Sequence, residues 1–428
     1  MMLSLPYGKK IIKMDLHGIN YTVIRPEIIK PAINQTQIVI NALNSGINKS
    51  FTAGAEKNKS VAIGINDQSR PIPNHILIPC LIDYLCNLGF DPKNIRFFIA
   101  TGTHVPLKHN EFPLILDSSI ISKYQVVSHD CDEEDNLAYL GTTSAGTPVQ
   151  VNRQFINAEI KILVGNIESH HFMGFSGGVK TAAIGLAGRK TITANHSMLS
   201  HPNTLMGLYS SNPMRQDVEE IGKMIGIDYA LNVVINDDKE IITAFWGEPA
   251  EVMLKGIEYI RNSVQMDLET STGNYDLVIA SPGGYPKDIN FYQAQKAITH
   301  ACLFSRPGGV IILVAECRDG MGSMKFEQFL SSRATFTEVI KDFEALQFEI
   351  GPHKAYLLAK QAINHNIILV SNIDEELVRK MHLLPAKTLG RAYDLAINAI
   401  HENPKIAVLP YATHTMPKIA EVLLEKNG

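Results

Sequence analysis

The sequence contains no apolar run as long as a membrane-spanning helix and no dense run of Lys or Arg. A bilayer span needs about 20 mainly apolar residues, and nucleic-acid binding needs clustered positive charge. The net charge is −4, from 39 Lys and Arg against 43 Asp and Glu. We therefore expect no membrane association and no nucleic-acid partner. The start, MMLSLPYGKK, has no basic region followed by an apolar core, which favours a cytoplasmic protein.

Cysteine is scarce and scattered. The five cysteines are odd in number and form no CxxC pair, which argues for reduced thiols and against a zinc–thiolate site. Free cysteines usually fill protein cores. We expect that role for most of Cys80, Cys86, Cys131, Cys302 and Cys317.

Internal repeats and biased composition are also absent. No fixed sequence period is present, and the contents of hydrophobic residues (45%) and charged residues (19%) are ordinary for a globular protein. A chain of 428 residues exceeds the size at which a single core stops growing. Two domains are therefore expected.

Short runs rich in Val, Ile and Leu recur in both halves and alternate with helical periodicity, the pattern of an α/β protein. Runs without polar alternation are typical of parallel strands covered on both faces. The predicted strands are residues 61–65, 95–100, 124–128, 160–164, 229–235, 276–280, 310–314, 367–370 and 406–409. The predicted helices are residues 73–88, 213–225, 249–264, 289–303, 335–346, 353–364, 375–382 and 386–401.

A polar stretch at residues 267–274 (DLETSTGN) separates the two halves, and we interpret it as a linker. We predict an N-terminal α/β domain over residues 1–268 and a C-terminal α/β domain over residues 275–428, both with mainly parallel sheets. Ligands of such proteins commonly bind where loops converge at the carboxyl ends of strands. The active site is therefore expected in the cleft between the domains, with the second domain closing over it.

Two polar loops follow predicted strands in the first half. Asp67 and Arg70 stand in the turn NDQSRP, and Arg is well suited to hold a carboxylate through two parallel hydrogen bonds. An N-cap Asp beside a surface Arg is the alternative interpretation. His104 follows in ATGTHVP, where it could act as an acid or base. A lone His is more commonly structural.

The third loop lies in the stretch GNIESHHFMGFSGGVKTAAIGLAGRKTITANHS, residues 165–197. Its glycines, Gly177 and Gly178 among them, precede Lys180 and suggest a phosphate-binding loop. A Walker A loop needs Gly directly before the Lys, however, and Val179 occupies that position. Lys180 could instead be a covalent attachment point, because a desolvated amine is a good nucleophile.

The same stretch contains three histidines. His170 and His171 are adjacent, so their side chains should point in different directions and should not easily share a metal ion. His196 could bind a metal with one of them, although three scattered histidines form a weak metal signature.

The fourth loop, SPGGYP at residues 281–286, leads into a predicted helix. Tyr292, Gln293 and Lys296 lie within one turn of that helix, with Gln293 and Lys296 on the same face. They could reach towards the first domain. A solvated helix face is the alternative interpretation.

Taken together, these motifs resemble the nickel-pincer lactate racemase family, and the resemblance extends over nearly the whole chain. The family pattern has an Asp-x-x-Arg-Pro turn, an Ala-Thr-Gly-x-His-x-Pro loop, a Glu-Ser-His segment leading to a Lys, an Ala-Asn-His-Ser end and a Gly-Gly-Tyr-Pro loop followed by Tyr-Gln-Ala-x-Lys. Here these occupy residues 67–71, 100–106, 168–180, 194–197 and 283–296, in that order.

The resemblance implies a nickel-pincer nucleotide cofactor, a pyridinium-3-thioamide-5-thiocarboxylic acid mononucleotide with Ni(II), tethered to Lys180. His196 would be the protein ligand to nickel, and the cofactor itself would supply the other ligands. The cofactor needs separate assembly proteins, which are the expected partners for activation. The cofactor-binding residues would be Lys180, Asp67, Ser176, Gly177 and Gly178.

The implied activity is racemisation of a small 2-hydroxy acid, with lactate as the first candidate. Reversible hydride transfer to the cofactor would form a 2-keto acid, while His104 and His170 each serve one enantiomer as acid or base. The substrate-binding residues would be Arg70, Gln293, Lys296 and Tyr292. His171 is left without a role and is interpreted as structural.

Two departures from the lactate-specific pattern put lactate in doubt. Val179 replaces an Arg, and His353 stands where those members carry a Trp. Another 2-hydroxy acid is therefore an alternative substrate for a racemase or epimerase. Alternatives from other classes are a nucleotide-dependent kinase or ligase that uses Lys180 and a non-catalytic carboxylate sensor.

Overall fold

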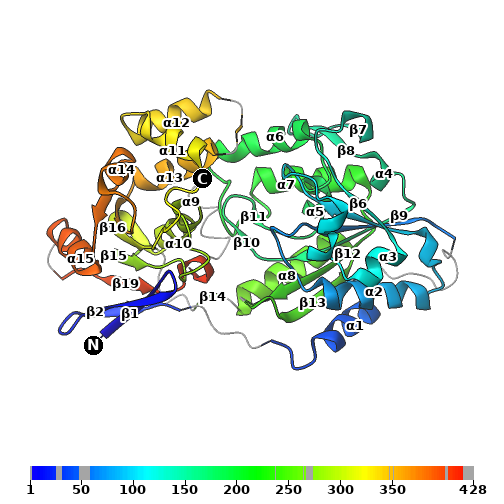
Figure 1. The fold of residues 1–428 in the computed structure, drawn as a ribbon, viewed down its shortest axis with the longest axis horizontal. Helices are drawn as coiled ribbons and strands as arrows, with labels where there is room; N and C mark the ends of the chain where they lie inside the picture. The colour runs from blue at the N-terminus through cyan, green and yellow to red at the C-terminus, as the bar shows by residue number, and fades with distance from the viewer. Residues whose placement is uncertain are drawn as a thin grey trace. The chain divides into compact units, whose positions relative to one another are not determined.

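The computed structural model describes residues 2–25, 31–47, 58–236, 238–263, 265–266, 273–346, 348–349, 351–400 and 403–417. The chain forms two compact units. The N-terminal unit comprises residues 29–263, and the C-terminal unit comprises residues 264–428 together with residues 1–28 (Figure 1).

The N-terminal unit is built on a six-stranded sheet in the order β13-β12-β9-β4-β5-β6. All neighbouring strands are parallel except β12 and β13, which are antiparallel. The five strands predicted in this half are confirmed, and β13 is an additional edge strand. They are β4 (Val61–Asn66), β5 (Ile95–Ala100), β6 (Gln125–Ser128), β9 (Ile160–Asn166), β12 (Tyr229–Ile235) and β13 (Ile241–Gly247).

Both faces of this sheet are covered, as the unbroken apolar strands predict. Ile63 and Ile65 belong to a core shared with helices α1 (Gln35–Ser45) and α2 (Asn74–Asn87). Gly64 faces the opposite side, where Phe155 and Leu186 lie. The remaining helices of the unit are α3 (Ser118–Lys123), α4 (Arg153–Ile156), α5 (Lys180–Ala183), α6 (Arg189–Ser197), α7 (Pro213–Ile225) and α8 (Pro249–Ser263).

The N-terminal unit also contains two short antiparallel hairpins that are separate from its six-stranded sheet. One joins β7 (Leu137–Thr142) to β8 (Pro148–Asn152), and the other joins β10 (Ser169–His170) to β11 (Gly174–Phe175). The second hairpin directly precedes the glycine-rich turn and Lys180, so it helps to place that turn.

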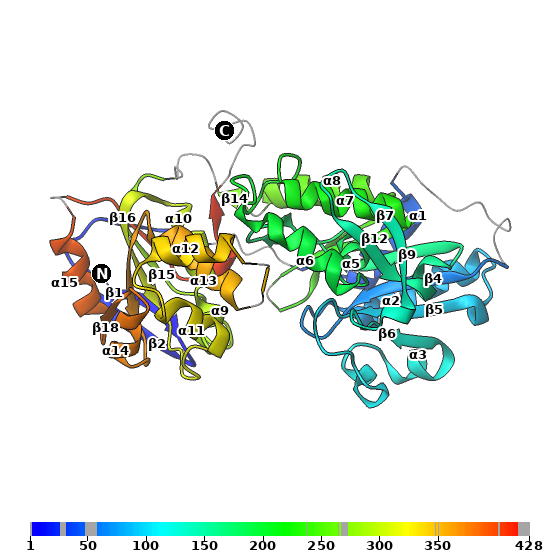
Figure 2. The ribbon, with the colours of Figure 1, turned by 90° about the horizontal axis from the view of Figure 1, so that it is seen from above.

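The C-terminal unit has a parallel six-stranded sheet in the order β18-β17-β16-β15-β19-β3. Helices α11, α12 and α13 pack against one another, and Figure 2 shows them together; α13 also packs on α10, which contacts β15 and β16. The strands are β3 (Tyr21–Val23), β15 (Tyr275–Ala280), β16 (Ser305–Val314), β17 (Asn366–Val370), β18 (Leu384–Ala386) and β19 (Ile406–Leu409). The helices are α9 (Phe291–Ala294), α10 (Lys296–Cys302), α11 (Met324–Ser331), α12 (Phe336–Glu344), α13 (Pro352–Ala362), α14 (Glu375–Lys380) and α15 (Leu389–Asn398).

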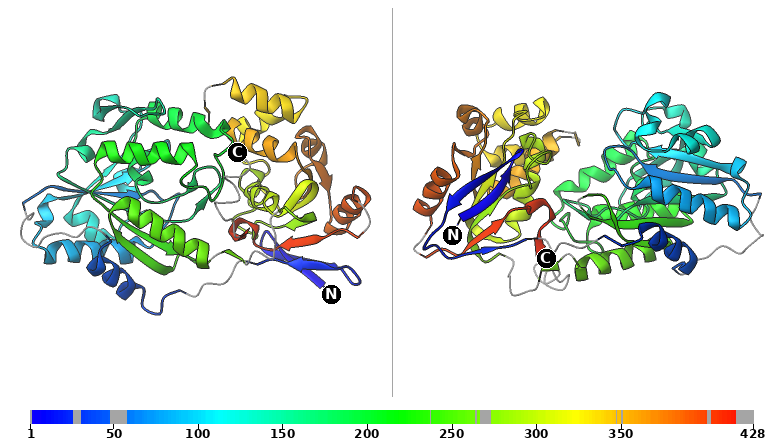
Figure 3. Two further views of the ribbon diagram at one scale, coloured as in Figure 1. Left: turned by 180° about the vertical axis from the view of Figure 1, so that it is seen from behind. Right: turned by 60° about the horizontal axis from the view of Figure 1, so that its bottom comes forward.

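The first 28 residues belong to the C-terminal unit in the structure, whereas the prediction placed them in an N-terminal domain of residues 1–268. The hairpin of β1 (Met2–Tyr7) and β2 (Lys10–Asp15) contributes Leu3 and Leu5 to the core of the C-terminal sheet. Strand β3 pairs with β19, and Figure 3 shows the blue N-terminal strands beside the red C-terminal ones. Most of the predicted linker, residues 267–272, lies outside the described residues.

The mixed α/β class with mainly parallel sheets is confirmed. The predicted cleft between the domains as the place of the active site stays a prediction. Within the described part of the chain, no helix combines the length and apolar character that crossing a bilayer requires.

Candidate active site

A pocket of about 730 Å³, counting the space open to solvent, lies in the N-terminal unit. Three strands end at it, because Asn66, Ala100 and Asn166, the last residues of β4, β5 and β9, all line it. The carboxyl edge of a parallel sheet is the usual position for a ligand in such folds. Seven predicted site residues line the pocket: Asp67, Arg70, His104, Ser176, Gly177, Lys180 and His196.

Asp67 follows β4 directly and is 4% exposed. Its Oδ1 accepts a hydrogen bond of 2.6 Å from the Ser69 hydroxyl, and its Oδ2 lies 2.6 Å from Nδ1 of His104. Burial raises the pKa of the Asp67 carboxyl, but the hydrogen bonds from His104 and Ser69 outweigh it and lower the pKa on balance. Asp67 is therefore an ionised acceptor. Its Oδ1 also accepts the Ser69 amide at 3.1 Å, so Asp67 caps this turn and pairs with His104 as well.

His104 lies on the loop after β5, and its side chain is 54% exposed. Because ionised Asp67 can only accept, Nδ1 of His104 must carry the hydrogen of their shared bond. A neutral His104 ring then has its lone pair on Nε2. Asp67 fixes both the tautomer and the orientation of His104, as the carboxylate does in other acid–base pairs of this kind.

Lys180 is the first residue of α5 and is 7% exposed. Within the described part of the chain its Nζ has no hydrogen-bond partner. Burial, followed by the positive charges of Arg70 and Arg215, holds the pKa of Lys180 well below its usual value. The shift favours the neutral amine, which is the nucleophilic form.

Close packing explains why glycines occupy the turn before Lys180. A Cβ on Gly177 would lie 2.8 Å from Asn232 Oδ1, and the φ of Gly177 is 92°. The Gly178 amide donates a 2.6 Å hydrogen bond to the same Asn232 oxygen. Asn232 thus holds the turn from β12, and the amide of Gly178 is already satisfied by the protein.

Arg215 on α7 is fully buried and supports the same turn from the other side. Its guanidinium donates to the carbonyls of Phe175 and Gly177 and pairs with Glu219 one helical turn away. Neither Arg215 nor Asn232 is predicted from the sequence. An Arg and a Glu four residues apart usually form a solvated pair, so only the buried surroundings of α7 distinguish this one.

His196 lies near the end of α6 and is half-buried. Its Nδ1 is 2.9 Å from the carbonyl oxygen of Ile192, which can only accept, so Nδ1 carries the hydrogen and Nε2 the lone pair. Burial, followed by the charge of Lys180, lowers the pKa of His196 to about 3. A neutral imidazole with an oriented lone pair is the form that binds metal ions.

His170 on β10 is not among the pocket-lining residues, although its ring packs edge-on against Phe172, which also contacts His196. Burial, followed by the charges of Lys180 and Arg70, holds the pKa of His170 well below its usual value. The Met173 amide donates to Nδ1 of His170 at 3.3 Å. The neutral ring therefore carries its hydrogen on Nε2, the reverse of His104.

The remaining predicted residues lie in the C-terminal unit. Tyr292 and Gln293 belong to the single turn α9, and Lys296 begins α10, so the predicted helix over residues 289–303 is interrupted at Gln295. The Nζ of Lys354, a residue that the sequence analysis gave no role, lies 5.9 Å from the centroid of the Tyr292 ring. Action of Tyr292, Gln293 and Lys296 on the substrate of the pocket stays a prediction.

The two departures from the lactate-specific pattern differ in location. Val179 is buried and packs against the backbone of α7 at Gly222, where a Cβ would lie 2.4 Å from the Val179 side chain. Val179 does not line the pocket. His353 lies in the first turn of α13, with its Nδ1 accepting the Gly351 amide at 3.2 Å.

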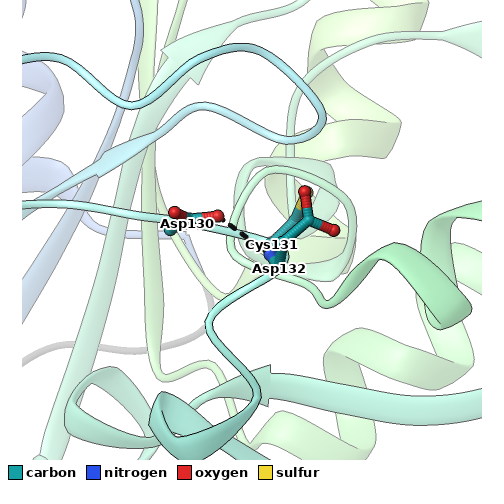
Figure 4. A group of neighbouring side chains, drawn as sticks. All are labelled: Asp130, Cys131 and Asp132. Atoms are coloured by element: carbon teal, nitrogen blue, oxygen red, sulfur yellow. Dashed lines mark hydrogen bonds between the residues drawn. The ribbon is translucent and has the colours of Figure 1, made fainter.

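One further cluster has the composition of a metal site. Asp130, Cys131 and Asp132 bring their possible ligand atoms within 4.8 Å of one another (Figure 4). Asp130 accepts the Asp132 amide in a local turn, and Asp132 is held by two hydrogen bonds from Arg189. Burial raises the pKa of the Cys131 thiol to about 11. These three residues therefore form a turn that hydrogen bonds hold in place, and the Cys131 thiol in it is protonated.

Two protein families match successive parts of the chain. The lactate racemase N-terminal domain family matches residues 7–207, and the lactate racemase C-terminal domain family matches residues 270–415. A lactate racemase from Thermoanaerobacterium thermosaccharolyticum is 31% identical over 418 residues, which cover 95% of this chain and 97% of that protein. The chain belongs to the lactate racemase family.

A second member of the lactate racemase family, from Lactiplantibacillus plantarum, is 29% identical over 95% of this chain and 97% of its own length. The predicted family is thus confirmed, and membership makes the protein an enzyme of the isomerase class.

Solved structures agree with this membership. The structure of the lactate racemase apoprotein from T. thermosaccharolyticum has a TM-score of 0.87 and 30% sequence identity, and the match covers 97% of this chain and all of that one. A protein from Thermotoga maritima has a TM-score of 0.59 at 17% identity over 88% of this chain and 96% of its own. The second likeness shows a common fold alone.

Proposed function

We propose that this protein racemises a small 2-hydroxy acid, with lactate as the first candidate, by reversible removal of the hydrogens of the hydroxyl group and of C2. The observation that supports this most strongly is that one pocket contains the Asp67–His104 pair, Arg70, the buried amine of Lys180 and the oriented imidazole of His196. A proton acceptor, a carboxylate-binding cation and a cofactor anchor are the groups that such a reaction needs.

The nickel-pincer nucleotide that the resemblance implies fits these residues. The buried Nζ of Lys180 has no hydrogen-bond partner in the described structure, and a neutral amine there suits a covalent link to an acyl or thioacyl group. The lone pair on Nε2 of His196 suits a metal ion. Asp67, Ser176 and Gly177 line the same pocket and would contact the rest of the group. When bound, the group would accept and return the C2 hydrogen as hydride.

The residues of the chain would carry out the other parts of the reaction. Arg70 would bind the substrate carboxylate. Nε2 of His104 would take the hydroxyl proton, and ionised Asp67 would stabilise the imidazolium that forms. Loss of both hydrogens leaves a planar 2-keto acid. Return of a hydride to the opposite face of C2, with return of a proton to the oxygen, inverts C2.

His170 is the proposed acid or base for the other enantiomer. In the present geometry Nε2 of His170 carries a hydrogen, because Nδ1 accepts the Met173 amide. Before it can accept a proton at Nε2, the ring must move this hydrogen to Nδ1 and break the contact with Met173. His104 needs no such step, because its Nε2 already carries the lone pair. The two histidines therefore begin as opposite tautomers.

The proposal is tested by loading the purified protein with the nickel-pincer nucleotide and following single enantiomers of 2-hydroxy acids by chiral chromatography. We expect interconversion, together with a mass increase on the peptide that contains Lys180. An unmodified Lys180 in fully active enzyme would disprove the tether. ATP-dependent turnover without nickel would favour a kinase or ligase, and binding without conversion would favour a carboxylate sensor.

The role of the Asp67–His104 pair is tested by Asp67→Asn. The amide no longer fixes the hydrogen of His104 on Nδ1, so we expect kcat to fall by a factor of about 10² to 10⁴, by analogy with other acid–base pairs. The matched control is Ser69→Ala, which removes a second hydrogen bond to Asp67 and keeps the pair. A loss of activity in the control as large as that in Asp67→Asn would contradict the assignment.

A further inference from the structure

The amine of Lys180 lies at the pocket of the N-terminal unit without a protein partner. Lys180 lines this pocket and is 7% exposed, and its Nζ is buried with no hydrogen-bond partner among the described residues. A buried lysine is normally paired, because an unpaired polar group out of water costs free energy. The amine is therefore available for a covalent bond to a ligand in the pocket.

The surroundings of this amine favour its uncharged form. Burial has the largest effect, and the positive charges of Arg70 and Arg215 lower the pKa of Lys180 further. Glu168 raises this pKa to a smaller extent. Arg215 already pairs with Glu219 and donates to the glycine-rich turn. A desolvated amine next to another cation is the arrangement that makes a lysine a nucleophile towards carbonyl carbon.

Arg70 provides a place for the carboxylate of a ligand in the same pocket. An arginine holds a carboxylate through two parallel hydrogen bonds. In a small 2-keto acid the carbonyl carbon C2 is bonded directly to the carboxylate carbon. A carboxylate on Arg70 therefore places C2 in the pocket that Lys180 lines, and the flexible stem of a lysine allows its Nζ to turn towards C2.

We propose that Lys180 forms an imine with small 2-keto acids in the cofactor-free protein. Nζ bonds to C2, and the carbonyl oxygen leaves as water with the two hydrogens of the amine, so the step needs neither oxidant nor reductant. The choice of ligand rests on the proposed function, in which a 2-keto acid forms in this pocket. The imine occupies the amine to which the cofactor would be tethered, so 2-keto acids compete with cofactor attachment.

The experiment traps the imine by reduction. Cofactor-free protein is incubated with pyruvate and sodium cyanoborohydride, and the modified lysines are identified by peptide mass spectrometry. We expect Lys180 to gain one carboxyethyl group about tenfold or more faster than Lys190. The side chain of Lys190 is 66% exposed on α6, so it reports the reactivity of an ordinary lysine. Equal rates at the two lysines would overturn the proposal.

The variant Arg70→Gln tests the place of the carboxylate. It removes the guanidinium and also one charge that acts on the amine, so pyruvate is compared with acetaldehyde, which has no carboxylate. A changed amine affects both probes, whereas a lost carboxylate site affects pyruvate alone. We expect the ratio of the pyruvate rate to the acetaldehyde rate at Lys180 to fall about tenfold or more. An unchanged ratio would overturn the selection of 2-keto acids by Arg70.

The matched control is Arg96→Gln. Arg96 is exposed near the amino end of β5, whereas the pocket lies at the carboxyl end of this strand. Its replacement should leave the ratio of the two rates unchanged. A fall as large as that in Arg70→Gln would contradict a local role of Arg70.

Two outcomes separate this inference from the proposed function. A lack of adduct at Lys180, in protein that racemises a 2-hydroxy acid once it is loaded with cofactor, would overturn the inference and leave the proposed function intact. Protein that carries the reduced adduct should no longer take up the cofactor. Full cofactor attachment and racemisation by this modified protein would support the imine but disprove the tether at Lys180, and with it the competition.

Discussion

At the residue scale, the chemistry of the candidate site depends on which atoms carry hydrogens. Asp67 fixes the hydrogen of His104 on Nδ1, and Ile192 does the same for His196. Residue types and spacing in the sequence indicate which side chains matter. They cannot give a tautomer, because the partners of His104 and His196 are set by the fold.

Lys180 provides a prediction about stability. Its pKa is well below the usual value in the folded protein and returns to that value on unfolding. The unfolded state therefore binds more protons at neutral pH, and the free energy of unfolding falls as the pH decreases below about 10.4, the usual lysine pKa. We expect Lys180→Met to raise the free energy of unfolding at pH 7 by about 1 to 3 kcal/mol.

The measurement is denaturant unfolding of the cofactor-free protein at pH 7 and pH 10. The gain in Lys180→Met should be smaller at pH 10, where the unfolded chain binds fewer protons. Lys190→Met, at an exposed position of α6, is the control and should change the free energy of unfolding little. A stabilisation in the control equal to that in Lys180→Met would show that the effect does not come from burial of the amine.

At the element scale, the glycine-rich turn connects the sheet to Lys180. Its glycines suggest a phosphate-binding loop in the sequence, whereas the structure shows Gly177 and Gly178 packed against Asn232. The contact joins residues of β12 to a turn more than fifty positions earlier. No local pattern contains this contact, so the glycines are visible in the sequence but the packing that requires them is not.

The close packing and backbone conformation of this turn predict the effect of the substitution Gly177→Ala. The new Cβ would meet Asn232, Ile167 and Asn166 at 2.9 Å or less, and its φ of 92° is strained for alanine. We expect a destabilisation of about 2 kcal/mol or more by calorimetry, with weaker attachment of cofactor at Lys180. Gly390→Ala in α15 is the control, because its Cβ meets nothing within 4 Å and alanine favours a helix. Equal stability of the two variants would contradict this account.

At the scale of the whole molecule, the first strands belong to the C-terminal unit. The side chain of Leu5 is 0% exposed in the core of that unit, while Ile11 on the neighbouring strand is 56% exposed. We expect Leu5→Ala to destabilise the C-terminal unit by about 2 to 5 kcal/mol, and Ile11→Ala to have little effect. Hydrogen exchange of the intact protein would show whether the loss of protection in Leu5→Ala is confined to the strands of the C-terminal sheet. A loss spread equally over the N-terminal sheet would contradict the division.

The sequence by itself determined the α/β class, nine of the twelve strands of the two large sheets and seven of the residues that line the pocket. These follow from short-range properties, because an unbroken apolar run predicts a strand covered on both faces and polar residues at its end predict a loop. The runs at residues 61–65, 95–100 and 160–164 became β4, β5 and β9, whose ends line the pocket.

Only the tertiary structure decided three other matters. It joined the N-terminal strands to the C-terminal sheet through the pairing of β3 with β19, placed Arg215 and Asn232 behind the glycine-rich turn, and buried Lys354 beside the Tyr292 ring. Each depends on contacts between residues far apart in the chain. Burial, and the shifts in pKa that follow from it, arise from packing, which no local run of residues contains.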